Sequence, residues 1–374
     1  MNNNLGDNLN KLTQAFNNRT IIGGSDEKSE EKKYNKLIIG FHTNKNGSSG
    51  IINPLKIDSM ELKRHGFRPA AQIFTQVPQT SIFSKMESQD EIIKLLKEND
   101  LSLVIHSPYS INDFWKKNDL TKLHKSLKNA ELFVEAEALI SDDSNTDDRF
   151  KGIVVHLPKL IPEDVVNVIK NRQHTSVPIL LENHAYKPGV DSYELPSKLN
   201  KLSKLLDEAK TPNWGFCIDT AHLFVCISDE DRKNGYRVEE RSCMERWLSE
   251  LTNAARSHIR CWHLNGSVNP ASSHDDKHSI PVFGTDHLLS THVPDKMWGE
   301  LLMKDEIIAD GLDKHLNDQI ESLQDSSLIP VLKHAMTHNI PVILEINRGN
   351  DNDITNCLKM FKRLESEIIN NPNF

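Results

Sequence analysis

The sequence contains few cysteines, and none of them belongs to a recognisable motif. The five are Cys217, Cys226, Cys243, Cys261 and Cys357. An odd number of cysteines without a Cys-x-x-Cys pair favours a reduced, intracellular protein. The sequence therefore predicts no metal cage built from thiolates.

Long apolar segments are also missing, and we expect no leader sequence. No apolar run reaches the ~18 residues that a membrane-spanning helix needs. The first residues, Met1 to Asn4, lack the basic start and the apolar core of a signal peptide. We expect an intracellular protein, cytoplasmic or nuclear, that is not secreted and has no membrane partner.

The chain is short of positive charge, with 45 Lys and Arg against 53 Asp and Glu and a net charge of −8. This balance by itself argues against a nucleic-acid partner. Three bound divalent cations would cancel six of these eight negative charges, and they would put positive charge where phosphates dock. The deficit therefore excludes a nucleic acid only if the chain binds no metal.

The length of 374 residues fits one large barrel with appendages, and it also fits two medium domains. Residues 1–36 are rich in Asn, Ser, Lys and Glu, and we expect them to form a flexible tail. Residues 37–374 are expected to form the main domain. A segment at about 285–327 is long for one barrel connection, so we expect an insertion there, before the last strand.

From Lys36 onward, short apolar runs alternate with longer amphipathic stretches of helical periodicity. Eight runs have the length and composition of strands buried on both faces: Leu37–His42, Ala70–Thr75, Leu101–His106, Gly152–His156, Val177–Glu182, Trp214–Asp219, Ile259–His263 and Ile340–Glu345. Eight strands alternating with helices predict an α/β fold, a closed TIM (β/α)8 barrel. A doubly wound open sheet is the competing architecture.

The third to the eighth of these runs each end in a candidate metal ligand. These residues are His106, His156, Glu182, Asp219, His263 and Glu345. A single histidine after an apolar run is usually a core side chain, but six polar endings are a different pattern. Because the C-terminal ends of barrel strands meet at one face, where active sites are built, we expect all six side chains in one pocket.

Two short motifs add further ligands. His222 follows Asp219 by three residues at a strand-to-helix turn, and Asp276 and His278 lie two residues apart. The combined set of five histidines and four carboxylates suits zinc, with manganese or iron also possible. Nine ligands exceed what one ion uses, so they predict two or three ions, an arrangement suited to phosphodiester hydrolysis.

These residues stand in segments that resemble the signature segments of endonuclease IV, in the same order along the chain. The segments are His106-Ser-Pro-Tyr109, Val155-His156, Leu181-Glu182-Asn183, Cys217-Ile-Asp-Thr-Ala-His222, His263-Leu-Asn265, Asp276-Lys-His278 and Leu344-Glu345. The resemblance covers roughly residues 36–348. Its most specific part is the Cys-Ile-Asp-Thr-Ala-His run together with the later Asp-Lys-His.

The resemblance implies a TIM barrel with three zinc ions. It assigns His106 and His156 to the first ion, with Glu182 shared between the first and the second. Asp219, His263 and Glu345 would complete the second site, and His222, Asp276 and His278 would hold the third. Glu182 and Glu345 are the candidate catalytic residues. The implied activity is cleavage of double-stranded DNA on the 5′ side of abasic sites during base-excision repair, leaving a 3′-hydroxyl and a 5′-deoxyribose phosphate. We expect a monomer.

The chain departs from the family pattern at several positions. Residues 183–186 read Asn-His-Ala-Tyr where the family usually has Asn-Thr-Ala and a Gly-rich stretch, and Gly266 replaces a usual Asp. The family inserts an Arg, a Tyr and a Leu into DNA at the lesion. Tyr109 matches the Tyr and is the candidate DNA contact, but Ser110 replaces the Leu and no arginine stands near 76–79. These changes spare the metal ligands and affect damage recognition.

Two other functions compete with this interpretation. Barrel-shaped sugar isomerases and epimerases also carry Glu, Asp and His at strand ends, but they usually need only four or five ligands and lack the Asp-Lys-His motif. A non-catalytic DNA-damage binder would explain the altered wedge residues but not the intact ligand set. Incision of an abasic duplex separates these three functions.

Overall fold

The computed structural model describes residues 34–44, 50–75, 89–108, 121–140, 149–158, 161–187, 192–275, 277–279, 325–345, 351–371 and 374. No helix within these ranges is long and apolar enough to cross a membrane. The predicted N-terminal tail lies outside them up to residue 33. The predicted insertion at 285–327 is described only from residue 325 onward.

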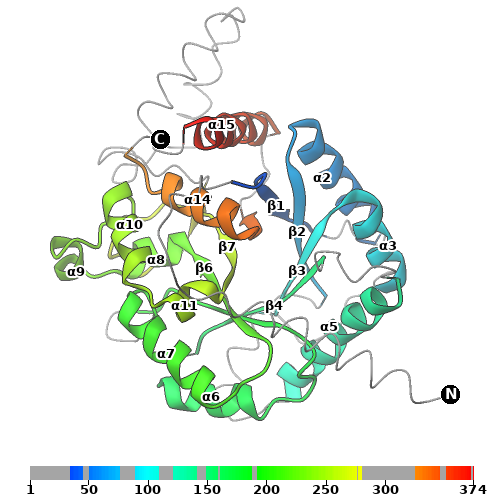
Figure 1. Cartoon of the computed structure of the whole chain (residues 1–374), viewed down its shortest axis with the longest axis horizontal. Helices are drawn as coiled ribbons and strands as arrows, with labels where there is room; N and C mark the ends of the chain where they lie inside the picture. Colours follow the sequence, from blue (N-terminus) through cyan, green and yellow to red (C-terminus); the bar gives the residue numbers. More distant parts are fainter. Residues whose placement is uncertain are drawn as a thin grey trace, which may run out of the picture.

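Eight parallel strands close into a barrel in the order β1-β10-β7-β6-β5-β4-β3-β2 (Figure 1). The strands are β1 (Ile38–His42), β2 (Arg68–Phe74), β3 (Ser102–His106), β4 (Phe150–His156), β5 (Ile179–Glu182), β6 (Trp214–Asp219), β7 (Ile259–His263) and β10 (Val342–Leu344). Each lies within or overlaps one of the eight predicted apolar runs. The predicted TIM barrel is confirmed, and the closed strand order excludes the open doubly wound sheet.

Helices surround the ring of strands (Figure 1). They are α2 (Ile52–Arg64), α3 (Gln89–Asn99), α5 (Thr121–Ile140), α6 (Pro162–Lys170), α7 (Pro196–Glu208), α8 (Thr220–Cys226), α9 (Asp229–Lys233), α10 (Arg241–Glu250), α11 (Asn253–Ser257), α14 (Leu328–His338) and α15 (Asp351–Asn370). Strands β8 (Gly266–Ser267) and β9 (His278–Ser279) form a separate antiparallel pair. This pair extends the loop that follows β7.

Local sequence explains where the helices begin and which face they bury. Helix α6 starts at Pro162, whose missing N–H costs nothing in the first turn, and Glu163 and Asp164 follow where negative charge is favoured. Helix α7 also starts at a proline, and it buries Leu199, Leu202 and other residues at helical spacing. The apolar stripe of each helix therefore packs against the barrel.

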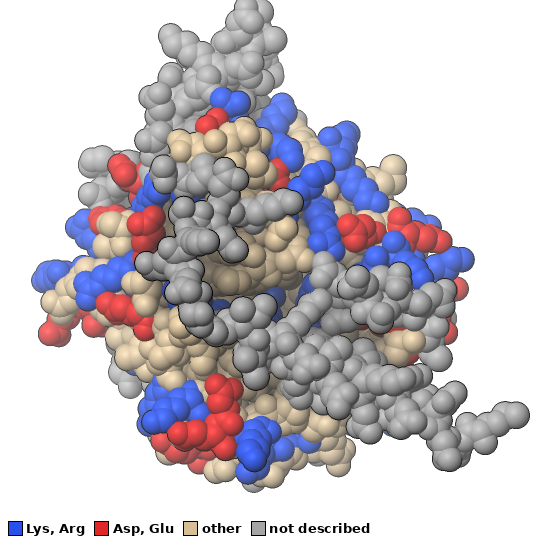
Figure 2. Space-filling model, in the orientation of Figure 1, with Lys and Arg blue, Asp and Glu red and all other residues tan. Residues whose placement is uncertain are grey.

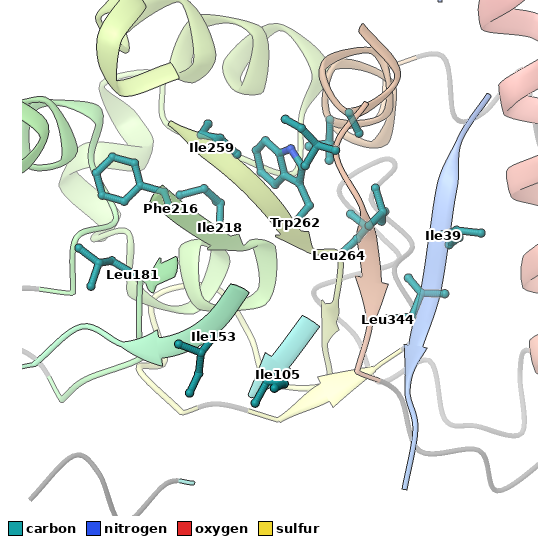
Figure 3. Close-up of a cluster of buried hydrophobic side chains, with 14 of the residues drawn as sticks. Ile39, Ile105, Ile153, Leu181, Phe216, Ile218, Ile259, Trp262, Leu264 and Leu344 are labelled. Carbon is teal, nitrogen blue, oxygen red and sulfur yellow. The ribbon is translucent and has the colours of Figure 1, made fainter. Parts of the chain in front are cut away.

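The side chains that point outward from the strands hold the barrel to its helices. Figure 3 shows Ile105, Leu181, Ile218, Trp262 and Leu344 in this buried layer. Each of them stands directly before a predicted metal ligand in the sequence. Because successive strand residues face opposite sides, anchoring these side chains outward turns the next residue into the barrel.

A separate apolar layer fills the inside of the barrel. It contains one residue from each strand: Ile38, Ala70, Val104, Val154, Leu180, Cys217, Cys261 and Ile343. All eight are buried, so the barrel interior is a packed core. This layer forms the floor beneath the candidate site.

Candidate metal centre

The predicted ligands lie two residues beyond the apolar floor on six strands. Val104 is followed in this way by His106, Val154 by His156, Leu180 by Glu182, Cys217 by Asp219, Cys261 by His263 and Ile343 by Glu345. A step of two returns to the same face of a strand, so the ligand layer also points inward. The alternation of the strands thereby brings six polar side chains to one level of the barrel.

His106, His156 and Glu182 form the first group. Glu182 Oε2 lies 3.4 Å from His106 Nε2 and 3.1 Å from His156 Nε2, and this buried oxygen makes no hydrogen bond with the described residues. Ligands held tetrahedrally at the zinc distances of 2.0–2.1 Å stand about 3.3 Å apart. The spacing of these three atoms therefore fits one zinc ion.

Glu182 also belongs to the second group, which it shares with Asp219, His263 and Glu345. His263 Nδ1 lies 2.9 Å from Glu182 Oε1, 3.4 Å from Glu345 Oε2 and 3.8 Å from Asp219 Oδ2. The two oxygens of Glu182 thus face different histidines. This is the geometry that a bridging carboxylate requires.

The third group consists of Asp219, His222 and His278. Asp219 caps helix α8 by accepting a hydrogen bond from the His222 N–H at 2.9 Å, and this cap fixes both residues at the turn. His278 Nε2 lies 3.6 Å from Asp219 Oδ2 and is placed by the β8–β9 pair, in which it faces Ser267. Asp276, the predicted carboxylate of this group, lies outside the described residues.

Hydrogen bonds to backbone carbonyls orient two of the histidines. His222 Nδ1 lies 2.8 Å from the Asn183 carbonyl, and His106 Nδ1 lies 2.6 Å from the Ser107 carbonyl. An N–H donated from Nδ1 leaves Nε2 of each ring as the lone-pair donor to a cation. Such contacts fix the tautomer that a metal ligand needs.

Two buried asparagines hold the carboxylates. Asn183 donates to the backbone carbonyl of Asp219 and accepts from its N–H, at 3.0 and 2.8 Å. Asn265 donates to Asp219 Oδ2 at 2.7 Å and accepts from the Glu345 N–H at 2.8 Å. Both asparagines stand in the quoted signature segments, but nothing in those segments assigned them this supporting role.

Strands β1 and β2 contribute two further polar residues that sequence reasoning missed. Gln72 lies two residues beyond the floor residue Ala70. Its Oε1 lies 2.7 Å from His263 Nε2, and its Nε2 lies 2.5 Å from Glu345 Oε1. His42 Nδ1 lies 3.6 Å from the same Glu345 oxygen. Both strands were predicted. Gln72 lies two residues after the floor residue Ala70 and His42 lies four residues after Ile38, and this even spacing is the sequence feature that could have identified them.

His184, in the loop that departs from the family pattern, lies against the centre. Its ring stacks on His156 at 4.1 Å between centroids and 20° between planes, and it meets His222 edge-on at 5.2 Å. His184 is therefore in aromatic contact with a histidine of the first group and with one of the third.

The charges of the centre stabilise one another. Burial raises the pKa of Glu182, but the neighbouring His263 and His156 outweigh this and hold it well below its usual range. Burial lowers the pKa of His263, but Glu345 and Glu182 raise it well above its usual value. Burial lowers the pKa of His156, which favours a neutral ring. Ionised carboxylates beside a neutral imidazole are suitable ligands for a divalent cation.

Comparison with known proteins agrees with this fold. Residues 60–290 match the model of AP endonuclease family 2, described as a xylose isomerase-like TIM barrel. The chain belongs to this family. The match spans more than half of the sequence and includes eight of the nine predicted ligands, the exception being Glu345.

Relatives within the family cover most of the chain. A probable AP endonuclease of African swine fever virus is 25% identical over 295 residues, covering 77% of this chain and 82% of the relative. A probable endonuclease 4 of Mycoplasma mycoides is 24% identical over 262 residues, covering 67% and 82%.

Solved structures support the barrel fold. The structure of AsfvAP:AG aligns with a TM-score of 0.64 at 20% identity and covers 89% of this chain and 98% of its own. Endonuclease IV from Thermus thermophilus aligns with a TM-score of 0.54 at 22% identity, covering 88% and 99%. Tyr109, the predicted DNA contact, lies outside the described residues.

Proposed function

We propose that the chain is a zinc-dependent AP endonuclease that hydrolyses the phosphodiester 5′ to abasic sites in double-stranded DNA. One observation carries the proposal: three groups of histidine and carboxylate ligands are linked through shared residues. Glu182 joins the first group to the second, and Asp219 joins the second to the third. The names of the viral and mycoplasmal relatives support the choice of substrate.

Bound zinc ions would polarise a phosphodiester, and they would lower the pKa of a bound water molecule to ~7. The protein itself supplies the positions. Glu182 would set the separation of two ions, because its two oxygens face different groups. Asn265 fixes Asp219 and Glu345 relative to each other, since it is hydrogen-bonded to both. We infer that Glu182 and Glu345 are the carboxylates closest to the reaction.

The surface charge is consistent with a centre that needs cations to receive DNA. Over the described residues on the face seen in Figure 2, Lys and Arg are interspersed with Asp and Glu, and neither sign predominates. The net charge of −8 would repel phosphates in the absence of bound metal. Zinc would therefore contribute to substrate binding as well as to chemistry.

Tyr109 remains our proposed DNA contact, on the strength of its match to the family segment. Aromatic stacking on a base exposed beside the lesion contributes ~1–3 kcal/mol. Because Ser110 supplies no apolar wedge, we expect Tyr109→Ala to weaken binding to abasic duplex by about 10-fold, the loss of one stacked base. Binding to abasic and intact duplexes at matched salt distinguishes lesion recognition from phosphate contacts.

The deciding experiment combines elemental analysis with an incision assay. We expect close to three metal ions per chain, mostly zinc, and a cut 5′ to the abasic site that leaves a 3′-hydroxyl. Chelation should abolish the cut, and added zinc should restore it. One ion or fewer in carefully prepared protein would overturn the three-ion centre. Turnover of a free sugar without incision would favour an isomerase, and retention of abasic DNA without a cut would favour a damage binder.

A further inference from the structure

Two thiols lie in the floor of the barrel directly beneath the metal centre. Cys217 and Cys261 are in register on neighbouring parallel strands, β6 and β7, and both are fully buried. They belong to the inner apolar layer, two residues before Asp219 and His263. The sequence predicted no thiolate metal site because the two cysteines are far apart along the chain, and strand pairing brings them together.

The two thiols and a histidine of the centre form a compact group. One ligand atom from each of Cys217, Cys261 and His263 lies within 4.8 Å of the other two. All three side chains are buried. Ligands around a tetrahedral zinc ion at a zinc–sulfur distance of 2.3 Å stand about 3.8 Å apart. A larger soft cation spaces its ligands more widely, which suits atoms that lie within 4.8 Å of one another.

We propose that Cys217, Cys261 and His263 form a second kind of metal site, which takes a soft, thiophilic cation such as Cd²⁺ or Cu⁺. Its donors differ from those of the centre above it, where oxygen and nitrogen predominate. Thiolates select soft ions, whereas carboxylates suit harder ones. Binding would replace the two thiol protons, which leave to solvent, by bonds from both sulfurs to the cation.

His263 makes the two sites mutually exclusive. It belongs to the thiol group and also to the group of Glu182, Asp219 and Glu345. Nε2 of His263 is engaged by Gln72 at 2.7 Å, so an ion in the floor and an ion above it compete for the other nitrogen of the ring. A soft cation in the floor therefore withdraws His263 from the second group, and it would inactivate the enzyme without blocking the mouth of the barrel.

The test uses the full chain, freed of metal and titrated with Cd²⁺ alone, with the ultraviolet thiolate-to-cadmium charge-transfer band as the readout. Wild type should develop the band with about one equivalent bound. Cys217→Ala/Cys261→Ala should lack it, whereas Cys357→Ala, which removes a buried cysteine in α15, should keep it. A band that persists in the double variant, or one that wild type never shows, overturns the proposal.

A single variant keeps the proposal testable if the double variant does not fold. Cys217→Ala leaves two of the three ligands, and we expect it to bind Cd²⁺ about 10-fold more weakly or worse, as is usual for a damaged metal shell. Unchanged affinity in a folded Cys217→Ala protein would contradict the site. Circular dichroism on each variant confirms that the comparison is between folded proteins.

The inactivation step rests on the proposed function, and a second readout keeps the two apart. Zinc-loaded wild type and the double variant are challenged with increasing Cd²⁺, and each is compared with its own rate without cadmium. Inhibition of wild type should need about 10-fold less Cd²⁺ than inhibition of the variant, matching the lost ligands. Equal inhibition rejects the withdrawal of His263. Absence of incision in every sample would reject the nuclease assignment and leave the charge-transfer result as the test of the site.

Discussion

Gln72 Oε1 lies 2.7 Å from Nε2 of His263. The contact joins β2 to β7 across the interior of the barrel, although the two strands are not neighbours in the sheet. An Nε2–H donated to Gln72 leaves Nδ1 of His263 directed at Glu182, Asp219 and Glu345. Gln72 is thus a positioning residue that selects the nitrogen available to the second group.

Replacing Gln72 by alanine should weaken the second metal site. Without the acceptor at Nε2, His263 can rotate or change tautomer, and the loss of such an outer contact typically costs 10–100-fold in metal affinity. The measurement is a competition titration against a chromophoric zinc chelator. Gln173→Ala, at an exposed position after α6, is the matched control. Wild-type affinity in the Gln72 variant would show that the contact is incidental.

Glu182→Gln should disturb two groups at once. The amide removes one negative charge from between two cations, so their mutual repulsion is no longer offset. We expect incision to fall by at least ~10²-fold and the bound metal to fall to about one ion per chain. Glu208→Gln, on the exposed end of α7, makes the same chemical change far from the centre and should retain full activity. A near wild-type rate in Glu182→Gln would exclude a bridging role.

The ring of His184 should matter more than its nitrogens. It lies in stacking contact with His156, and aromatic pairs contribute ~0.5–1.5 kcal/mol. His184→Phe keeps a flat ring and should retain metal affinity, whereas His184→Ala removes the contact and should lower it about 2–10-fold, the equivalent of that energy. Both variants are compared by the same chelator titration. Equal losses in the two variants would indicate that an imidazole nitrogen is required and would refute the stacking role.

Acid should destabilise the fold through His334. Burial, with the nearby charges of His338 and Arg256, lowers the pKa of His334 to about 3, and its Nδ1 lies 3.3 Å from the Trp262 indole N–H. At pH values between the ordinary histidine pKa of about 6.5 and the folded value, the unfolded chain therefore binds a proton at this ring and the folded chain does not. Stability conferred by the neutral ring is full above pH 6.5 and is lost as the pH falls.

The expected slope is up to about 1.4 kcal/mol per pH unit for this one proton. His334→Gln keeps an acceptor for Trp262 but does not titrate, so its unfolding free energy should fall less steeply between pH 6.5 and 4. Urea denaturation of metal-free protein at several pH values measures the difference, and contributions from the rest of the protein cancel between the two chains. Parallel pH profiles would assign the acid sensitivity elsewhere.

The sequence predicted the strands well because each is buried on both faces and reads as an apolar run. Six of the nine candidate ligands were identified because they end those runs. Val104 and His106, or Leu180 and Glu182, show that a polar residue two positions after an inward apolar residue must also point inward. The closed barrel shows that Val104 and Leu180 face inward, and the step of two then fixes the direction of His106 and Glu182.

What the sequence could not provide was contact between residues far apart along the chain. The pairing of Cys217 with Cys261 depends on the register of β6 and β7, and that of Gln72 with His263 depends on closure of the barrel. The stacking of His184 on His156 depends on the path of a loop. Asp276 and Tyr109 lie outside the described residues and stay predictions.

The shortest barrel strand, β10, lies where the first and last strands of the barrel meet. It shares three Cα pairs with β1 and two with β7, and the residue that follows it is Glu345. If the ions bind as proposed, the second one ties this short strand to β5 and β6 on the other part of the ring. Bound metal would then stabilise the closed barrel. Variants that lose metal to a chelator more easily should therefore also unfold more easily.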